Sequence, residues 1–217
     1  LSALPSDVKK KLLVSQNRAG FTPLFDALQK GNPKNFKIYM LALSALPDEI
    51  KQGLLVTQNK YGFTPLLQAL NNGNLENLNA YLKEIVCFPE NDKKDLIMHS
   101  NKAGYNVLHQ ACYGGYATVT TLIDFIRENL RDSQKVLQEL SCQRTKRGLP
   151  PSVPPRNQDA RKINQLIKSL RSSIGQASTD GLFSKSESKQ RETKFDRIRY
   201  KRWGNGNSKE CSWEKTI

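Results

Sequence analysis

The sequence predicts an all-α helical solenoid of three to four repeats, followed by a basic, mostly disordered C-terminal tail. The sequence matches itself at a shift of 42 residues. Within each copy, apolar residues recur at helical spacing, which is typical of helices with one buried face. The net charge is +3 over residues 1–140 and +11 over residues 141–217. The basic character therefore belongs to the end of the chain.

The 42-residue shift aligns three copies without an insertion. The segment LSALP occurs at residues 1–5 and again at residues 43–47. Later in each copy the sequence reads Phe21-Thr-Pro-Leu24, Phe63-Thr-Pro-Leu66 and Tyr105-Asn-Val-Leu108. An alanine and then a glycine follow at fixed distances, as Ala27, Ala69 and Ala111 and as Gly31, Gly73 and Gly115. Such sustained self-similarity predicts a stack of equivalent structural units.

The motif contains the signals that start and end a helix. The glycine before it, Gly62 in the second copy, suits a tight turn with positive φ. Threonine is a favourable N-cap, and proline is tolerated at the first helical position. We therefore expect helices to start near Pro23, Pro65 and Val107 and the following glycine to end each helix in the left-handed conformation. A second helix should follow in each copy, with an apolar stripe such as Leu75, Leu78, Tyr81 and Leu82.

The pattern Gly-x-Thr-Pro-Leu-x-x-Ala, with a glycine four residues beyond the alanine, resembles the ankyrin repeat over residues 1 to about 130. Ankyrin repeats have about 33 residues, so each copy here is about nine residues longer. Proline and acidic residues open the added stretch, as in Pro47-Asp48-Glu49, and predict a short third helix. An armadillo-like solenoid, whose repeats have about this length, is the rival assignment. The Thr-Pro-Leu turn favours ankyrin.

The lengthened repeats look like those of ankyrin proteins that intracellular bacteria deliver into host cells. This resemblance implies a protein-recognition module that forms part of a secreted effector. No apolar run approaches the length of about 20 residues needed to span a bilayer, so we expect a soluble, intracellular protein, located in the host cytoplasm if it is secreted. The scattered cysteines fit such a reducing setting.

We expect three parts in the chain. Residues 1–140 should form the repeat array, with repeats at about 1–42, 43–84 and 85–130. Residues 141–171 should form a degenerate fourth repeat or a capping helix, because residues 145–151 echo residues 59–65 two residues out of register. Pro154 and Pro155 interrupt the helix expected there, whereas residues 161–171 fit an amphipathic helix. Residues 172–217 are poor in apolar side chains and should form the disordered tail.

The sequence offers no starting point for catalysis, so we do not expect an enzyme, a metal site or a cofactor. His99 and His109 are its two histidines, and no Ser/His/Asp order, phosphate loop or close ligand pair accompanies them. By resemblance, His109 stands where ankyrin repeats carry a histidine that ties the turn together. Cys87 and Cys112 are most simply small core residues.

The resemblance implies that the turn before each first helix and the exposed side of that helix line a concave binding face. We expect a monomer that binds a protein partner, with no small-molecule substrate. The recurring residues Asn17, Asn59 and Asn101 should instead fix the turns. The predicted partner-binding residues are Arg18, Asp26, Gln29, Lys60, Tyr61, Gln68, Asn71, Lys102, Gln110 and Tyr113.

The basic tail supports an alternative function. Residues 194–203 interleave aromatic side chains with lysine and arginine, a composition suited to phosphate contacts and base stacking. The alternative is therefore binding of nucleic acid or of an anionic membrane through the tail. The segment matches no fold signature of nucleic-acid-binding proteins.

Overall fold

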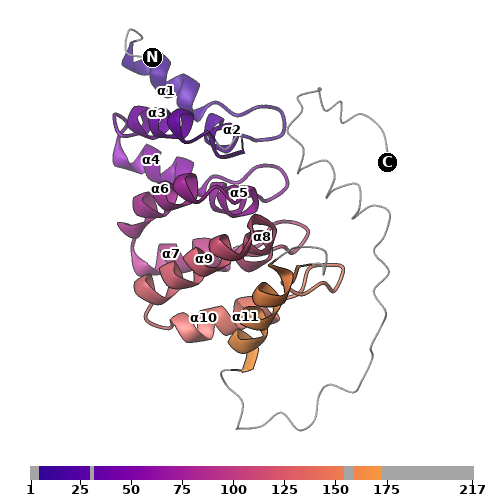
Figure 1. Cartoon of the computed structure of the whole chain (residues 1–217). Helices are drawn as coiled ribbons and strands as arrows, with labels where there is room; N and C mark the ends of the chain where they lie inside the picture. The colour runs from indigo at the N-terminus through magenta and orange to yellow at the C-terminus, as the bar shows by residue number, and fades with distance from the viewer. Residues whose placement is uncertain (1–4, 30–31, 154–158, 173–217) are drawn as a thin grey trace, which may run out of the picture. The chain divides into compact units, whose positions relative to one another are not determined.

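A computed structural model of the chain describes residues 5–29, 32–153 and 159–172 (Figure 1). These residues form eleven α-helices and no β-strand, apart from one isolated bridge between Ser100 and Asn106. The predicted all-α class is therefore confirmed. Most of the expected tail, from residue 173 on, lies outside the described residues, as do Gly31, Pro154 and Pro155.

Each copy of the repeat folds into three helices. The first copy contains α1 (Ser6–Val14), α2 (Pro23–Gln29) and α3 (Pro33–Leu43), the second α4 (Asp48–Val56), α5 (Pro65–Asn72) and α6 (Leu75–Val86), and the third α7 (Glu90–Met98), α8 (Val107–Gly114) and α9 (Tyr116–Asn129). The predicted starts of α2, α5 and α8 are confirmed. The added stretch of each copy forms the additional helix α1, α4 or α7, as expected.

Equivalent helices stack on one another along the array. The helix α5 packs between α2 and α8, and α6 packs between α3 and α9 (Figure 1). The core runs through both layers, and Leu66, Leu70 and Leu78 are fully buried in it. Leu75 departs from the predicted buried stripe, because it is the first residue of α6 and remains 37% exposed.

An asparagine organises each turn before a first helix, as predicted. In the second copy, Asn59 Oδ1 accepts hydrogen bonds from the backbone N–H groups of Tyr61 and Phe63, at 2.9 and 3.0 Å. The turn glycine, Gly62, has a φ of +76°, which favours glycine over other residues. Asn17 and Asn101 make the same pair of bonds in their own turns. The three turns therefore have one hydrogen-bonding pattern.

Neighbouring turns are joined by backbone hydrogen bonds. The N–H of Lys60 donates to the carbonyl oxygen of Ala19 at 2.9 Å, and the N–H of Lys102 donates to that of Tyr61 at 3.0 Å. A third bond joins the N–H of Lys146 to the carbonyl oxygen of Ala103, also at 3.0 Å. Each turn thus lies at a fixed position relative to the next one along the stack.

The first helices of the second and third copies approach each other closely where they end. Gly73 ends α5 in the left-handed conformation, with φ +72°, as predicted. Gly115 has φ +105° and ψ 178°, so α8 ends differently from the prediction. A methyl group added to Gly114 would lie 2.2 Å from the carbonyl oxygen of Leu70 and 3.0 Å from the Cα of Gly73. This junction therefore has no room for a side chain at residue 114.

Side chains of the second helices bind the ends of the added helices. The hydroxyl of Tyr39 donates to the carbonyl oxygen of Leu13 in α1, and that of Tyr81 donates to Leu55 in α4. These carbonyls lie in the last turn of a helix, where no intrahelical donor reaches them. The tyrosines therefore connect the added helices to the rest of each unit, and burial raises the pKa of the Tyr81 hydroxyl.

A fourth unit follows the three copies. It comprises α10 (Ser133–Cys142), a turn at residues 145–148 and α11 (Ala160–Ser172), and α11 packs on α9 and α10. The helix predicted over residues 161–171 is thus present. The boundary expected at residue 140, between the repeat array and the fourth unit, falls within α10. Thr145 takes the place of the turn asparagine, with its Oγ1 accepting from the N–H of Leu149 at 3.1 Å. Arg171 Nε donates to the carbonyl oxygen of Ser141 in α10 at 2.8 Å. This bond is equivalent to those that the tyrosines of α3 and α6 make with carbonyl oxygens near the ends of α1 and α4.

Candidate functional site

The predicted binding residues lie on the turns and on the first helices, which we call the turn surface. It comprises residues 17–20, 59–62, 101–104 and 145–148 together with the outward side of α2, α5 and α8. The structure leaves eight of the ten predicted residues open to solvent at least in part, namely Arg18, Asp26, Gln29, Lys60, Tyr61, Asn71, Lys102 and Tyr113. These side chains are accessible to a partner.

Gln68 and Gln110 were expected to be exposed, and that expectation is wrong. Their exposed fractions are 1% and 3%. Both lie on first helices that are covered by neighbours, since α5 is packed between α2 and α8, and α8 contacts α5, α9 and α10. A helix packed between two neighbouring units buries side chains on more of its faces than the apolar pattern of its own sequence indicates. These two glutamines belong to the contact between units and not to the turn surface.

A cation occupies the same position in all four turns. Arg18, Lys60, Lys102 and Lys146 each follow the turn asparagine or threonine directly, and each is exposed. The backbone hydrogen bonds between turns hold Lys60, Lys102 and Lys146 in one row. Sequence reasoning missed Lys146 as a member of this row, because the fourth turn is shifted by two residues. The echo of residues 59–65 in residues 145–151 was the signal that could have revealed it.

Two aromatic side chains on the turn surface are held by neighbouring rings. The ring of Tyr61 lies 6.4 Å from that of Phe21 in the preceding turn, and the ring of Tyr113 lies 6.2 Å from that of Tyr105. Tyr61 is 49% exposed and Tyr113 is 38% exposed. Each tyrosine is therefore positioned by a ring contact while part of it stays available to a partner.

His109 ties the third unit to the fourth turn, in agreement with the role implied by the ankyrin resemblance. Its Nε2 donates to the carbonyl oxygen of Leu149 at 3.1 Å, and its Nδ1 accepts from the N–H of Asn106 at 3.3 Å. Asn106 in turn donates to the carbonyl oxygen of Leu140 in α10 at 2.9 Å. Burial lowers the pKa of His109 to about 4. The neutral ring therefore suits this structural position.

Acidification is expected to destabilise the protein through His109. Its pKa is about 4 in the folded protein and near 6.5 when exposed, so the unfolded chain takes up the proton first as the pH falls. The stabilising contribution is complete above pH 6.5 and is lost progressively toward pH 4. Urea denaturation at pH 7.5 and pH 5 should show this loss. The His109→Leu variant, which copies Leu67 of the second repeat, should lose less stability between these two pH values, and an equal loss would contradict the assignment.

The cysteines occupy different environments. Cys112 is buried, as predicted, and burial raises the pKa of its thiol to about 12. Cys87 is exposed, so the prediction that it is a core residue is wrong. It follows the last residue of α6 and acts as the C-cap of that helix.

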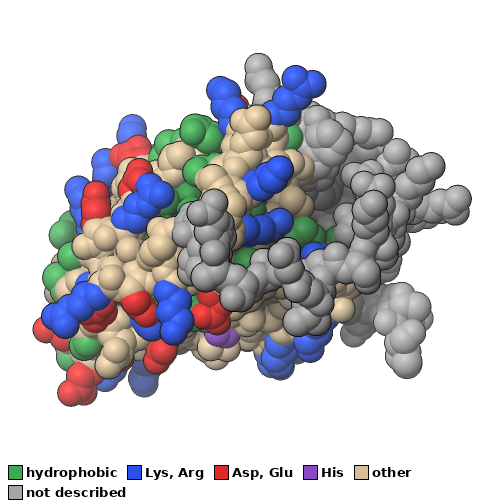
Figure 2. All heavy atoms as spheres, turned by 90° about the horizontal axis from the view of Figure 1, so that it is seen from below, with side chains coloured by type: hydrophobic (Ala, Val, Ile, Leu, Met, Phe, Trp, Pro, Cys, Tyr) green, Lys and Arg blue, Asp and Glu red, His purple; other side chains and the backbone are tan. Residues whose placement is uncertain are grey.

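The described part of the chain contains no cluster of three or more histidine, cysteine, aspartate or glutamate side chains placed to hold a metal ion. Within the same residues, no helix is long and apolar enough to cross a membrane. Acidic and basic side chains lie next to one another over the left half of Figure 2. This mixture agrees with the small net charge of the repeat array.

The turns and stacked helices define an ankyrin-like helical solenoid with lengthened units. No family model matches the chain, and no curated protein matches it. Among solved structures, the chain is similar to an ankyrin repeat domain from Acinetobacter baumannii AYE, with 17% identity, a TM-score of 0.40 and coverage of 73% of this chain and 86% of that chain. It is also similar to a chain in the complex of a predatory endopeptidase from Bdellovibrio bacteriovorus with an immunity protein, with 16% identity, a TM-score of 0.29 and coverage of 77% and 96%. These likenesses are low, and the fold assignment rests on the turns and helices described above.

Proposed function

We propose that this protein is a non-catalytic interaction module whose turn surface binds an extended, acidic segment of a protein partner. The observation that carries this proposal is the row of cations at one equivalent position in four successive turns. Exposed like charges in a row favour a partner of opposite charge along its length. An extended segment can follow such a row, because solenoids present long, continuous surfaces.

The rigidity of the turns supports this function. Each turn is fixed internally by a side-chain cap and externally by a backbone hydrogen bond to its neighbour. A surface that is already ordered loses little conformational freedom on binding. Tyr61 and Tyr113 add aromatic contacts beside the cations, and partly exposed aromatic residues often act as interface anchors. The turn surface therefore offers both charge and apolar contact area.

The cellular role that we propose is the recognition part of a secreted bacterial effector. Its support is the resemblance of the lengthened repeats to those of ankyrin effectors. A secretion-reporter fusion, expressed in an intracellular bacterium during infection, tests this role. Reporter signal in the host cytoplasm is expected, and signal confined to the bacterium would count against it.

The anchor role of the two tyrosines is tested with the double variant Tyr61→Ala/Tyr113→Ala. The full chain is used to recover a partner from host-cell lysate, and the affinity of the identified partner is then measured. We expect the double variant to bind about 30-fold more weakly, corresponding to about 2 kcal/mol. Loss of the two ring contacts should lower stability only modestly, because such pairs contribute about 0.5–1.5 kcal/mol each.

The control is Tyr116→Ala, since Tyr116 is 36% exposed but lies on the second helix α9. This variant should bind the partner with unchanged affinity. The charge requirement is tested with Lys60→Gln and Lys102→Gln, which should weaken binding most at low salt. Unchanged affinity in the double tyrosine variant and in both lysine variants would show that the turn surface is not the binding site.

A second candidate function is binding of nucleic acid or anionic membrane through residues 172–217. The high positive charge and the aromatic residues of this part of the sequence favour it. Phosphate contacts make affinity fall steeply with salt concentration. If removal of residues 173–217 abolished partner binding while the double tyrosine variant bound normally, the tail would be the functional part.

A further inference from the structure

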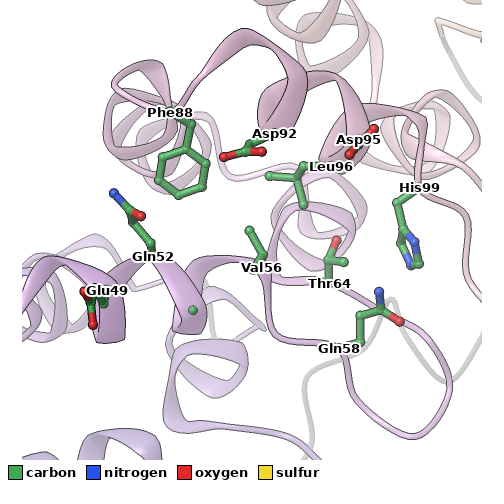
Figure 3. A pocket seen from close by; sticks show the side chains of 11 residues that line it. Glu49, Gln52, Val56, Gln58, Thr64, Phe88, Asp92, Asp95, Leu96 and His99 are labelled. Carbon is green, nitrogen blue, oxygen red and sulfur yellow. The ribbon is translucent and has the colours of Figure 1, made fainter.

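The added helices α4 and α7 flank an open groove between the second and third units. The groove has a volume of about 600 Å³, which is within the range of ligand sites, about 300–1,000 Å³. Gln52 and Val56 on α4 face Phe88, Asp92 and Leu96 of the third unit (Figure 3). Both helices lie toward the left of Figure 1, whereas the turns extend to the right. The added helices therefore form the part of the groove that lies away from the turns, whereas Gln58, Thr64 and His99 line its end next to the second turn.

The groove combines an apolar floor with negative charge. Phe88 and Leu96 are mostly buried beneath it, at 8% and 5% exposure. The carboxylates of Glu49, Asp92 and Asp95 line it. Among the described residues, none of these three carboxylates is part of an ion pair. Within the described part of the chain, no lysine or arginine side chain is therefore paired with these carboxylates.

The lysines of the two helices are engaged elsewhere. Lys51 pairs with Glu84 in α6, and Lys94 pairs with Asp132 just before α10. The ammonium group of Lys93 donates to the carbonyl oxygen of Val86 at 3.1 Å. The lysines on α4 and α7 thus interact with groups other than the three carboxylates of the groove.

A second feature of the groove is the glycine at residue 53. It lies inside α4 and lines the groove. Glycine inside a helix costs about 0.5–1 kcal/mol relative to alanine, and this one has no packing reason, since an added methyl group would meet nothing within 4 Å. The same position holds Lys11 in the first copy and Asp95 in the third. The absence of a side chain at residue 53 keeps the wall of the groove open.

We propose that the groove between α4 and α7 binds a short protein segment that carries a lysine or arginine beside an aliphatic residue. The aliphatic side chain would pack on Val56, which is 38% exposed, and on the small exposed parts of Phe88 and Leu96. The cation would meet the carboxylates of Asp92 and Asp95. Charge-assisted hydrogen bonds of this kind are stronger than neutral ones. The side-chain amide of Gln52, which lines the groove, would hydrogen-bond to the backbone of the bound segment. None of the carboxylates at this site belongs to the turn surface.

The test uses the full chain and short peptides with blocked ends. One set has a central lysine or arginine flanked by leucine, and a matched set has norleucine in place of the cation. Fluorescence anisotropy should show binding of the cationic set at least about tenfold tighter than of the norleucine set. Spermidine serves as a competitor, and binding of spermidine without binding of the peptides would overturn the proposal in favour of a free polyamine.

The variants separate binding from folding. Gly53→Leu should raise the denaturation midpoint, because leucine favours the helix, yet abolish peptide binding by filling the groove. Asp92→Asn/Asp95→Asn should weaken binding at least about tenfold while leaving the fold intact. The control Glu128→Gln removes an exposed carboxylate of α9 outside the groove and should bind normally.

Unchanged binding in Gly53→Leu, or equal loss in the Glu128→Gln control, would overturn the proposal. The Tyr61→Ala/Tyr113→Ala variant should bind these peptides as the parent does. Failure of the groove and failure of the turn surface are therefore distinguishable.

Discussion

Replacing Gly114 by alanine is expected to destabilise the protein by about 2 kcal/mol, measured by urea denaturation. The added methyl group would lie 2.2 Å from the carbonyl oxygen of Leu70 and 2.9 Å from Thr118 Oγ1. The carbonyl belongs to the backbone of α5, so relief requires α5 and α8 to move apart. Overpacking of this kind typically costs about 1–3 kcal/mol. The steric cost should exceed the gain of up to about 1 kcal/mol from better helix propensity.

Gly53→Ala is the matched control for this variant. It is the same substitution in another helix, but its methyl group meets nothing within 4 Å. It should therefore stabilise the protein by about 0.5–1 kcal/mol. Equal effects of the two substitutions would show that α5 and α8 do not approach each other as closely as described.

Leu66→Ala is expected to lower the free energy of unfolding by about 2–5 kcal/mol. Leu66 is fully buried in α5, the central first helix, with α2 on one side and α8 on the other. Truncation removes apolar contacts and leaves a cavity that the packed neighbours fill only in part. The variant should unfold at a lower urea concentration with the slope of the transition unchanged.

The control for Leu66 is Leu41→Ala. Leu41 lies on α3 and is 74% exposed, so its truncation should change stability by no more than about 0.5 kcal/mol. A small effect at Leu66, comparable to that at Leu41, would contradict the position of α5 in the centre of the core.

The regular part of the fold could be predicted because its signals are local. Thr64 caps α5, Pro65 starts it and Gly73 ends it in the left-handed conformation, all within ten residues of sequence. The same holds for Asn59, whose side chain bonds the backbone of its own turn. Repetition adds strength to such signals, since three copies carry the same chemistry at the same spacing.

Features that depend on neighbouring units could not be predicted in the same way. The burial of Gln68 and Gln110 follows from helices in other copies, not from the pattern of their own helix. The groove likewise requires Gly53 and Asp95 to come together from different units. Its charge also depends on Lys51 and Lys94 being paired elsewhere, which a sequence does not reveal.

The hydrogen bonds between successive turns have a consequence for how such an array can grow. Each joins a backbone N–H to a backbone carbonyl, and its register does not depend on side-chain identity. The spacing from Asn101 to Thr145 is two residues longer than the earlier spacings, yet the bond from Lys146 to Ala103 forms as in the other turns. The two additional residues are thus accommodated in the segment between the turns and do not change the bond that joins the turns. A chain with a second copy of residues 43–84 in tandem would form the same backbone bond between its turns, because that bond needs no particular side chain. Gene duplication would thus extend the array by whole units.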